Sequence, residues 1–140
     1  MKTLLIILFG TIAVACAASE ALPTKDVSYV KDGNDYRRSI CTLDLKLPTS
    51  AGFPTVVWFQ GGGLESGNKH FPRLDSRIAI VSVNYRLMKS GNGVQGSDCI
   101  HDAAEAVAWT LENIERYGGD PRKVYVRDMR TGSTFHVLES

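Results

Sequence analysis

Two short apolar runs that do not alternate with polar residues limit what this chain can fold into. Residues 55–59 lie between Pro54 and three glycines, and residues 78–85 form a second run that is rich in β-branched residues. Runs of this length without alternation are typical of strands that are covered on both faces of a sheet. We therefore expect two central strands with a layer of structure on each side.

A long amphipathic helix is predicted to follow the second run. Its apolar positions recur at three- and four-residue steps, at Ile100, Ala103, Ala104, Val107, Leu111 and Ile114. The charged positions that fall elsewhere are Asp102, Glu105, Glu112, Glu115 and Arg116. We expect Asp98 to cap this helix and Gly118 and Gly119 to end it. Because another apolar strand follows at 123–126, the order of elements predicts an α/β fold with parallel strands.

The residues before the first apolar run predict weaker elements. Residues 18–37 are polar, and their one strand-like stretch, 27–30, predicts a weak first strand. From Arg38 the chain alternates up to Pro48. One side carries Ile40, Thr42, Asp44 and Lys46, and the other carries Cys41, Leu43, Leu45 and Leu47. This pattern predicts a half-buried antiparallel or edge strand.

The first 17 residues have the pattern of a secretory signal peptide, because Lys2 precedes an apolar run and then small residues. Two processing signals overlap there. Ala15, Cys16 and Ala17 fit the small-x-small cleavage rule, whereas residues 13–16 approximate a bacterial lipobox with Cys16 as the lipid anchor. In both cases we expect an exported protein, which is secreted, periplasmic or anchored to the cell envelope.

Charge and cysteine content exclude several classes of function. Sixteen Lys and Arg against fifteen Asp and Glu give a net charge of +1, and the charges are scattered, so no nucleic-acid partner is predicted. Cys41 and Cys99 could form a disulfide in an exported protein, but the sequence favours two buried thiols. With no CxxC pair and no His pair at ligand spacing, we expect neither a metal nor another cofactor.

A glycine-rich loop directly follows the first central strand, at residues 60–63 (Gln-Gly-Gly-Gly). It can be a plain turn. It can also be an anion hole, in which the backbone N–H groups of Gly62 and Gly63 hold a negative oxygen. The sequence around the loop bears on this choice.

Five segments in order carry a resemblance to a known family: residues 41–48, 56–63, 81–87, 102–109 and 113–121. Together they resemble the N-terminal half of an α/β-hydrolase of the carboxylesterase and lipase type, which implies an incomplete three-layer αβα domain over residues 38–140. The resemblance implies hydrolysis of carboxylic esters by a serine nucleophile, with a histidine base, an orienting carboxylate and backbone donors for the oxyanion. It implies oxyanion donors at Gly62, Gly63 and Thr131.

The chain departs from the family pattern at the catalytic positions. Gln60 stands where the family has the first residue of His-Gly-Gly-Gly. The nucleophile elbow Gly-x-Ser-x-Gly, which leads from a strand into a helix, falls on residues 128–132 and places Arg130 at the serine. A guanidinium that stays protonated is no nucleophile. Ser133 and His136 form a Ser/His pair at helical spacing, which we interpret as a polar helix face.

The remaining partners of the catalytic triad are not predicted in this sequence. No Asp and His follow the elbow at the family's spacing, and we expect His70 and His101 to be surface residues. Two hypotheses result. The first is a truncated and inactive esterase homologue, a pseudoenzyme. The second is a binding module that uses Arg130, Gly62 and Gly63 to hold a small carboxylate or ester. In both, strand 124–126 would be an exposed edge open to self-association or to a partner.

Overall fold

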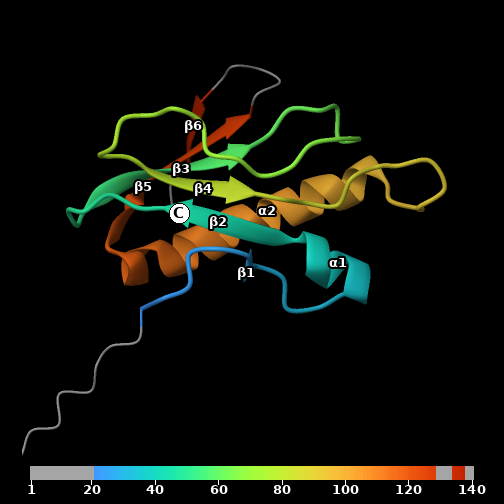
Figure 1. Cartoon of the computed structure of the whole chain (residues 1–140), viewed down its shortest axis with the longest axis horizontal. Coiled ribbons are helices and arrows are strands. Elements are labelled where there is room, and N and C mark those ends of the chain that lie inside the picture. The colour runs from blue at the N-terminus through green and yellow to red at the C-terminus, as the bar shows by residue number, and fades with distance from the viewer. Residues whose placement is uncertain (1–20, 129–133, 138–140) are drawn as a thin grey trace, which may run out of the picture.

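A computed structural model describes residues 21–128 and 134–137 of the chain. They form a six-stranded sheet with the order β1-β2-β4-β3-β5-β6 (Figure 1). The strands are β1 (Val27–Ser28), β2 (Thr42–Lys46), β3 (Phe53–Phe59), β4 (Ala79–Val83), β5 (Gly119–Asp128) and β6 (Thr134–Val137). The helices are α1 (Asp35–Ile40), α2 (Gly96–Asn113) and the 3₁₀ helix η1 (Ile114–Tyr117).

The centre of the sheet confirms the prediction from the apolar runs. β3 pairs in parallel with β4 on one side and with β5 on the other. Every residue of β4 is buried, and so is every residue of β3 except Pro54. The remaining pairs, β1 with β2, β2 with β4 and β5 with β6, are antiparallel. The sheet is therefore mixed, with its parallel part confined to three strands.

The alternating segment is an antiparallel strand, but it begins later than predicted. Cys41, Leu43 and Leu45 are buried, as the alternation indicated. However, residues 38–40 belong to α1, and β2 begins only at Thr42. The side chain of Asn34 caps α1 by accepting the N–H of Arg37 at 2.9 Å. This local cap ends the strand pattern early, and β2 lies inside the sheet rather than at its edge.

Helix α2 is present, but the prediction of its cap and of its buried face was wrong. Gln95 is the N-cap, and Asp98 accepts the N–H of Gln95 at 2.9 Å from the third helical position. The side chains that are buried along α2 are Cys99, Asp102, Ala106 and Thr110. Ile100, which the periodicity placed inside, is 67% exposed. The buried face is thus rotated by about one residue from the apolar stripe.

The far edge of the sheet also differs from the prediction. We expected strand 124–126 at an exposed edge, followed by a helix. Instead β6 pairs with β5, so that Val126 lies opposite Phe135 and Arg127 opposite Thr134. In the described part of the chain the edge strands are therefore β1 and β6. An antiparallel partner can pair with β5 immediately, whereas a parallel one would need a long crossover.

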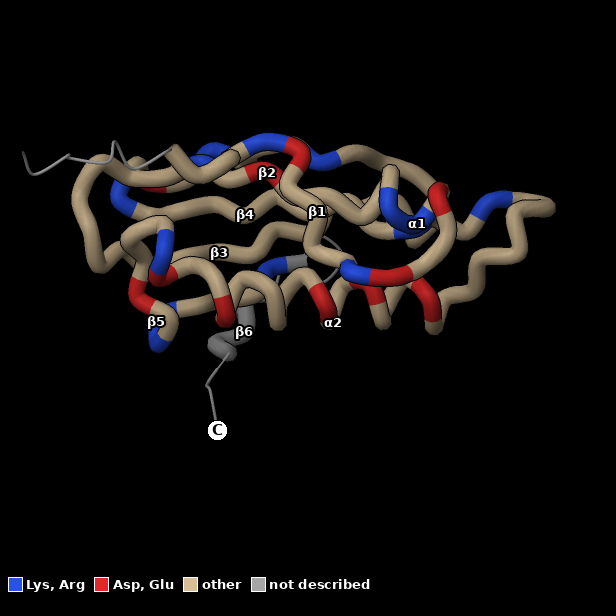
Figure 2. Tube along the Cα trace, turned by 90° about the horizontal axis from the view of Figure 1, so that it is seen from below, with Lys and Arg blue, Asp and Glu red and all other residues tan. Residues whose placement is uncertain are grey.

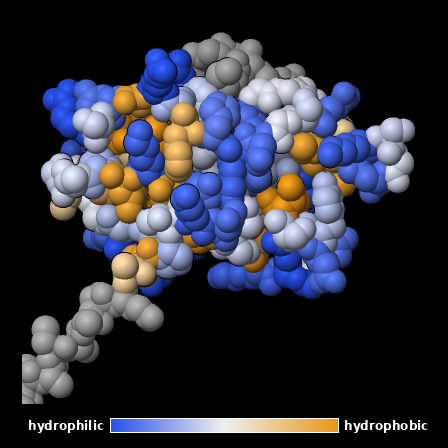
Figure 3. Space-filling view, in the orientation of Figure 1, coloured by the Kyte–Doolittle hydropathy of each residue, from blue (hydrophilic) through white to orange (hydrophobic). Residues whose placement is uncertain are grey.

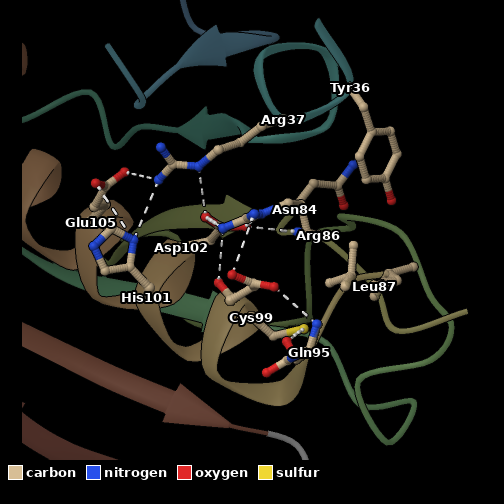
Figure 4. Close-up of polar contacts among 12 residues, drawn as sticks. Tyr36, Arg37, Asn84, Arg86, Leu87, Gln95, Cys99, His101, Asp102 and Glu105 are labelled. Atoms are coloured by element: carbon tan, nitrogen blue, oxygen red, sulfur yellow. Dashed lines mark hydrogen bonds and ion pairs between the residues drawn. The ribbon is translucent and has the colours of Figure 1, made fainter. Parts of the chain in front are cut away.

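A buried carboxylate joins the two helices and the sheet (Figure 4). Asp102 of α2 has no exposed surface. Its two oxygens accept Nε of Arg86 at 2.7 Å and Nε of Arg37 at 3.0 Å, and the backbone N–H of Arg86 at 3.2 Å. Arg37 also reaches Glu105 at 2.6 Å. These contacts connect α1, the segment after β4 and α2.

The charged residues of both signs are spread along the trace, as the sequence predicted (Figure 2). On the face seen in Figure 3, separate apolar patches lie among hydrophilic side chains. Within the residues that the structure describes, no helix has the length and apolar character needed to cross a membrane.

Replacing Asp102 by Asn should destabilise the fold by about 3 kcal/mol, because Arg37 and Arg86 lose their shared counter-charge in a buried site. The exposed Glu112→Gln on the same helix is the control and should cost less than about 0.5 kcal/mol. Urea unfolding at pH 7 measures both. Equal effects of the two substitutions would contradict the central role of Asp102.

The same carboxylate should make stability fall in acid. Burial alone would raise the pKa of Asp102, but the hydrogen bonds from Arg86 and Arg37 outweigh it and lower the pKa. Its contribution is therefore present above the pKa of an ordinary carboxyl, about 4, and is lost as the pH falls through the folded-state pKa. Asp102→Asn should flatten this acid dependence.

Candidate functional site

The glycine-rich loop leaves the carboxyl end of β3 and folds back over its own first residue. Gln60 is 5% exposed, and a Cβ on Gly67 would lie 2.6 Å from its side-chain amide carbon. The carbonyl of Gly62 accepts the N–H of Glu65 at 3.0 Å and that of Ser66 at 3.2 Å. Gln60 therefore lies beneath a turn formed by residues 62–67, in a closed loop packed on its own side chain.

Two backbone donors at the top of this turn have no partner. Within residues 21–128 and 134–137, neither the N–H of Gly62 nor that of Gly63 donates a hydrogen bond. Both glycines have positive φ, +133° and +65°. A Cβ on Gly62 would lie 2.1 Å from the carbonyl oxygen of Ser66. Glycine is thus required at Gly62 by the turn, and consecutive unpaired N–H groups of this kind can hold an anionic oxygen.

The departure at Gln60 leaves the loop anchored. The hydroxyl of Tyr85 lies 3.5 Å from the Gln60 carbonyl. Leu64, on the other side of the turn, accepts the N–H of Met88 at 2.8 Å through its carbonyl. The loop is therefore connected to the segment that follows β4 at two points.

An apolar cleft of about 420 Å³ opens next to the loop. Its walls come from the loop, the ends of β3 and β5, Tyr85 after β4 and one side of α2. They are Phe59, Leu64, Tyr85, Cys99, Ile100, Ala103, Ala104, Val107 and Val126. The stripe predicted to be the buried face of α2 thus supplies four of these residues.

The structure tests some of the predicted site residues and leaves others untested. Arg130, Thr131 and Ser133 lie outside the described residues, and His136 is described only through its backbone pairing with Tyr125. His70 and His101 are exposed, as predicted. Cys41 and Cys99 are free and buried, which agrees with two separate thiols. Burial raises the pKa of the Cys41 thiol to about 11, so this thiol is not a reactive nucleophile.

No group of three or more His, Cys, Asp or Glu side chains that could hold a metal ion is found among the described residues. The buried cluster around Asp102 is occupied by its own arginines. Its role is therefore structural.

Sequence comparison decides the family. A family model described as BD-FAE matches residues 43–138. The chain belongs to the BD-FAE family. BD-FAE domains are carboxylesterase-type α/β-hydrolases, so the fold class and the resemblance predicted from the sequence are confirmed.

Individual relatives agree with this BD-FAE assignment. Cholinesterase 1 of Branchiostoma lanceolatum is 33% identical over 107 residues, covering 65% of this chain and 30% of that protein. Lipase 2 of Diutina rugosa is 33% identical over 102 residues, covering 60% and 19%. A probable isoprenylcysteine alpha-carbonyl methylesterase of Arabidopsis thaliana is 31% identical over 139 residues, covering 87% and 32%. The chain thus spans between 19% and 32% of these relatives.

Solved structures show the same architecture. A thermophilic PNB esterase superposes with a TM-score of 0.55 at 28% identity, covering 65% of this chain and 22% of that one. A thermophilic esterase from Thermogutta terrifontis has a TM-score of 0.57 at 20% identity, covering 75% and 40%, and this likeness concerns the fold alone.

Sequence reasoning did not identify the residues that support the loop. Lys69, whose side chain is 10% exposed, lies just after the turn and contacts Asp26 and Asp44. These partners are far apart along the chain, so neither periodicity nor a motif indicates the contact. A lysine between turn residues was the one available signal.

The turn should distinguish its two glycines. Gly62→Ala should cost about 2 kcal/mol or more, because the new Cβ meets the Ser66 carbonyl and the φ of +133° is strained for an L-residue. Gly63→Ala has open space and should cost about 1 kcal/mol from its φ alone. Urea unfolding measures both. Equal costs would show that the turn differs from this geometry.

Proposed function

We propose that this chain is an exported homologue of carboxylesterases and lipases that does not hydrolyse esters with the nucleophile position it carries. The single observation that supports this most is β6. Residues 134–137 form a strand antiparallel to β5, where the family pattern has the helix that follows the nucleophile. A strained turn from strand to helix is what exposes the serine in this fold.

The chemistry at position 130 supports the same proposal. Arg130 has no nucleophilic lone pair at neutral pH, because its guanidinium stays protonated. Asp128 stands at the first glycine of the elbow motif, a position that suits glycine because of close packing. Of the parts of the reaction, the oxyanion donors at Gly62 and Gly63 are retained.

The proposal is tested with the full chain, p-nitrophenyl acetate and a fluorophosphonate probe. We expect no turnover above the heat-denatured chain and no covalent labelling, because the probe reacts with activated serines. Ser133→Ala should change neither result, and Ser66→Ala, an exposed serine beside the turn, is the matched control. Stoichiometric labelling that disappears in Ser133→Ala would refute the proposal.

A second candidate is a non-catalytic module that binds a small carboxylate or ester. The unpaired N–H groups of Gly62 and Gly63 favour it, since they lie at the carboxyl end of a central parallel strand, where open α/β sheets bind ligands. In this candidate Arg130 supplies the positive charge.

Calorimetric titration with acetate tests this second candidate. Arg130→Glu should weaken binding about tenfold or more, because a charge-assisted hydrogen bond is replaced by repulsion. Arg73→Glu, at an exposed arginine, is the matched control for net charge and should bind as the parent chain does. Equal binding by the two variants would contradict a role for Arg130.

Export is part of the proposal and rests on residues 1–17. The apolar run and the small residues before position 18 support cleavage by a signal peptidase, and Cys16 supports lipid attachment. Mass spectrometry of the N-terminus of the protein recovered from its native host distinguishes the two forms.

A further inference from the structure

Residues 60–78 connect β3 to β4 without a regular helix or strand. We call them the β3–β4 loop. The glycine-rich turn is the first part of this loop, so its shape depends on what holds the loop against the rest of the molecule.

The side chain of Lys69 joins three separate parts of the chain. Its ammonium group forms an ion pair with Asp26, lies 2.8 Å from Oδ1 of Asp44 and donates to Oγ1 of Thr42 at 3.1 Å. The same Oδ1 of Asp44 accepts the backbone N–H of Asp26 at 2.8 Å. One positive charge thus holds the N-terminal segment, β2 and the β3–β4 loop together.

The backbone next to Lys69 is held as well. The Lys69 N–H donates to Oδ1 of Asn84 at 2.6 Å, and Nδ2 of Asn84 donates to Oδ1 of Asn68 at 2.8 Å. The hydroxyl of Ser82 donates to the His70 carbonyl at 2.7 Å. Residues 68–70 are therefore positioned on β4 and on the residue that follows it.

This anchored segment directly continues the glycine-rich turn. Gly67 precedes Asn68 and packs on the side chain of Gln60, the residue before the three glycines. A displacement of residues 68–70 would therefore move Gly67 off Gln60 and loosen the turn that presents Gly62 and Gly63.

The N-terminal side of the junction is conformationally unusual. Asp26 has a φ of +50°, in the left-handed region that few non-glycine residues adopt. Its backbone N–H and its carboxylate are both engaged by the junction, which offsets the cost of this conformation.

The charges at the junction persist over a wide pH range. Burial alone would lower the pKa of Lys69, but Asp26 and Asp44 outweigh burial and raise the pKa. The hydrogen bond and the charge of Lys69 lower the pKa of Asp26. Both groups therefore stay ionised at neutral pH.

We propose that Lys69 is the positioning residue of the glycine-rich turn and that, through Asp26, it makes the order of Gly62 and Gly63 depend on the N-terminal segment. This inference concerns how the turn is held and goes beyond the proposed function, on which it depends only for the use of the two N–H groups. The N-terminal segment then acts as a support for the anion site.

Hydrogen exchange of the full chain, followed by mass spectrometry, tests the inference. Lys69→Met should speed exchange about tenfold or more in residues 60–70 and also in residues 24–28, while α2 remains unchanged. Lys69→Arg keeps the positive charge and should restore most of the protection. A Lys69→Arg variant that exchanges as fast as Lys69→Met would overturn a role for the charge.

A milder variant covers the case in which Lys69→Met unfolds the chain. The side chain of Asp26 is 79% exposed, so Asp26→Asn leaves the core intact. It should speed exchange about two- to fivefold in residues 60–70, and Asp35→Asn, at a carboxylate that is 99% exposed and paired with Arg38, should not. A change confined to residues 24–28, or no change in 60–70, would overturn the coupling. Ester hydrolysis is not part of this readout, so a failure of the proposed function would be seen separately.

Discussion

The burial of one carboxylate determines how the helices sit on this sheet. Asp102 has no exposed surface and accepts hydrogen bonds from Arg37 and Arg86, which come from α1 and from the segment after β4. A buried charge without partners would cost several kcal/mol, so α2 can occupy its place only in a rotation that brings Asp102 to both arginines. This requirement outweighs the burial of a larger apolar residue such as Ile100, and it leaves the apolar side of α2 as a wall of the cleft.

The sequence predicted the elements that depend on local pattern and missed those that depend on distant charges. Continuous apolar runs identified β3 and β4, because strands covered on both faces need no alternation. The glycine-rich loop was located because its backbone conformation requires glycine. The rotation of α2 was wrong because a hydrophobic period carries no information about a carboxylate that arginines elsewhere in the chain draw inward. The helix at 35–40 was missed for a similar reason, since Asn34 caps it and Arg37 anchors it to α2.

The candidate site was predicted in part. Gly62 and Gly63 followed from a motif, and their unpaired N–H groups agree with the predicted role. The support at Lys69 was not predicted, because Asp26, Asp44 and Lys69 meet only when β2 and the β3–β4 loop are placed side by side. The partner of β5 was also wrong: the family pattern implied a helix, whereas antiparallel pairing with β6 satisfies the backbone groups of β5 directly.

The two halves of the family's catalytic apparatus are held by independent contacts, and this explains how one can change without the other. The glycine-rich turn is held by Gln60, by the contact between Leu64 and Met88 and by the Lys69 junction, all on the side of β2 and β4. The nucleophile position follows β5, and its geometry depends on glycines that this sequence replaces with Asp128 and retains only at Gly132. None of the contacts described for the turn involves the elbow residues. Loss of the serine therefore leaves the anion-holding geometry of Gly62 and Gly63 intact, so a chain of this kind can keep a binding site for an acidic group after it has lost the means to attack an ester.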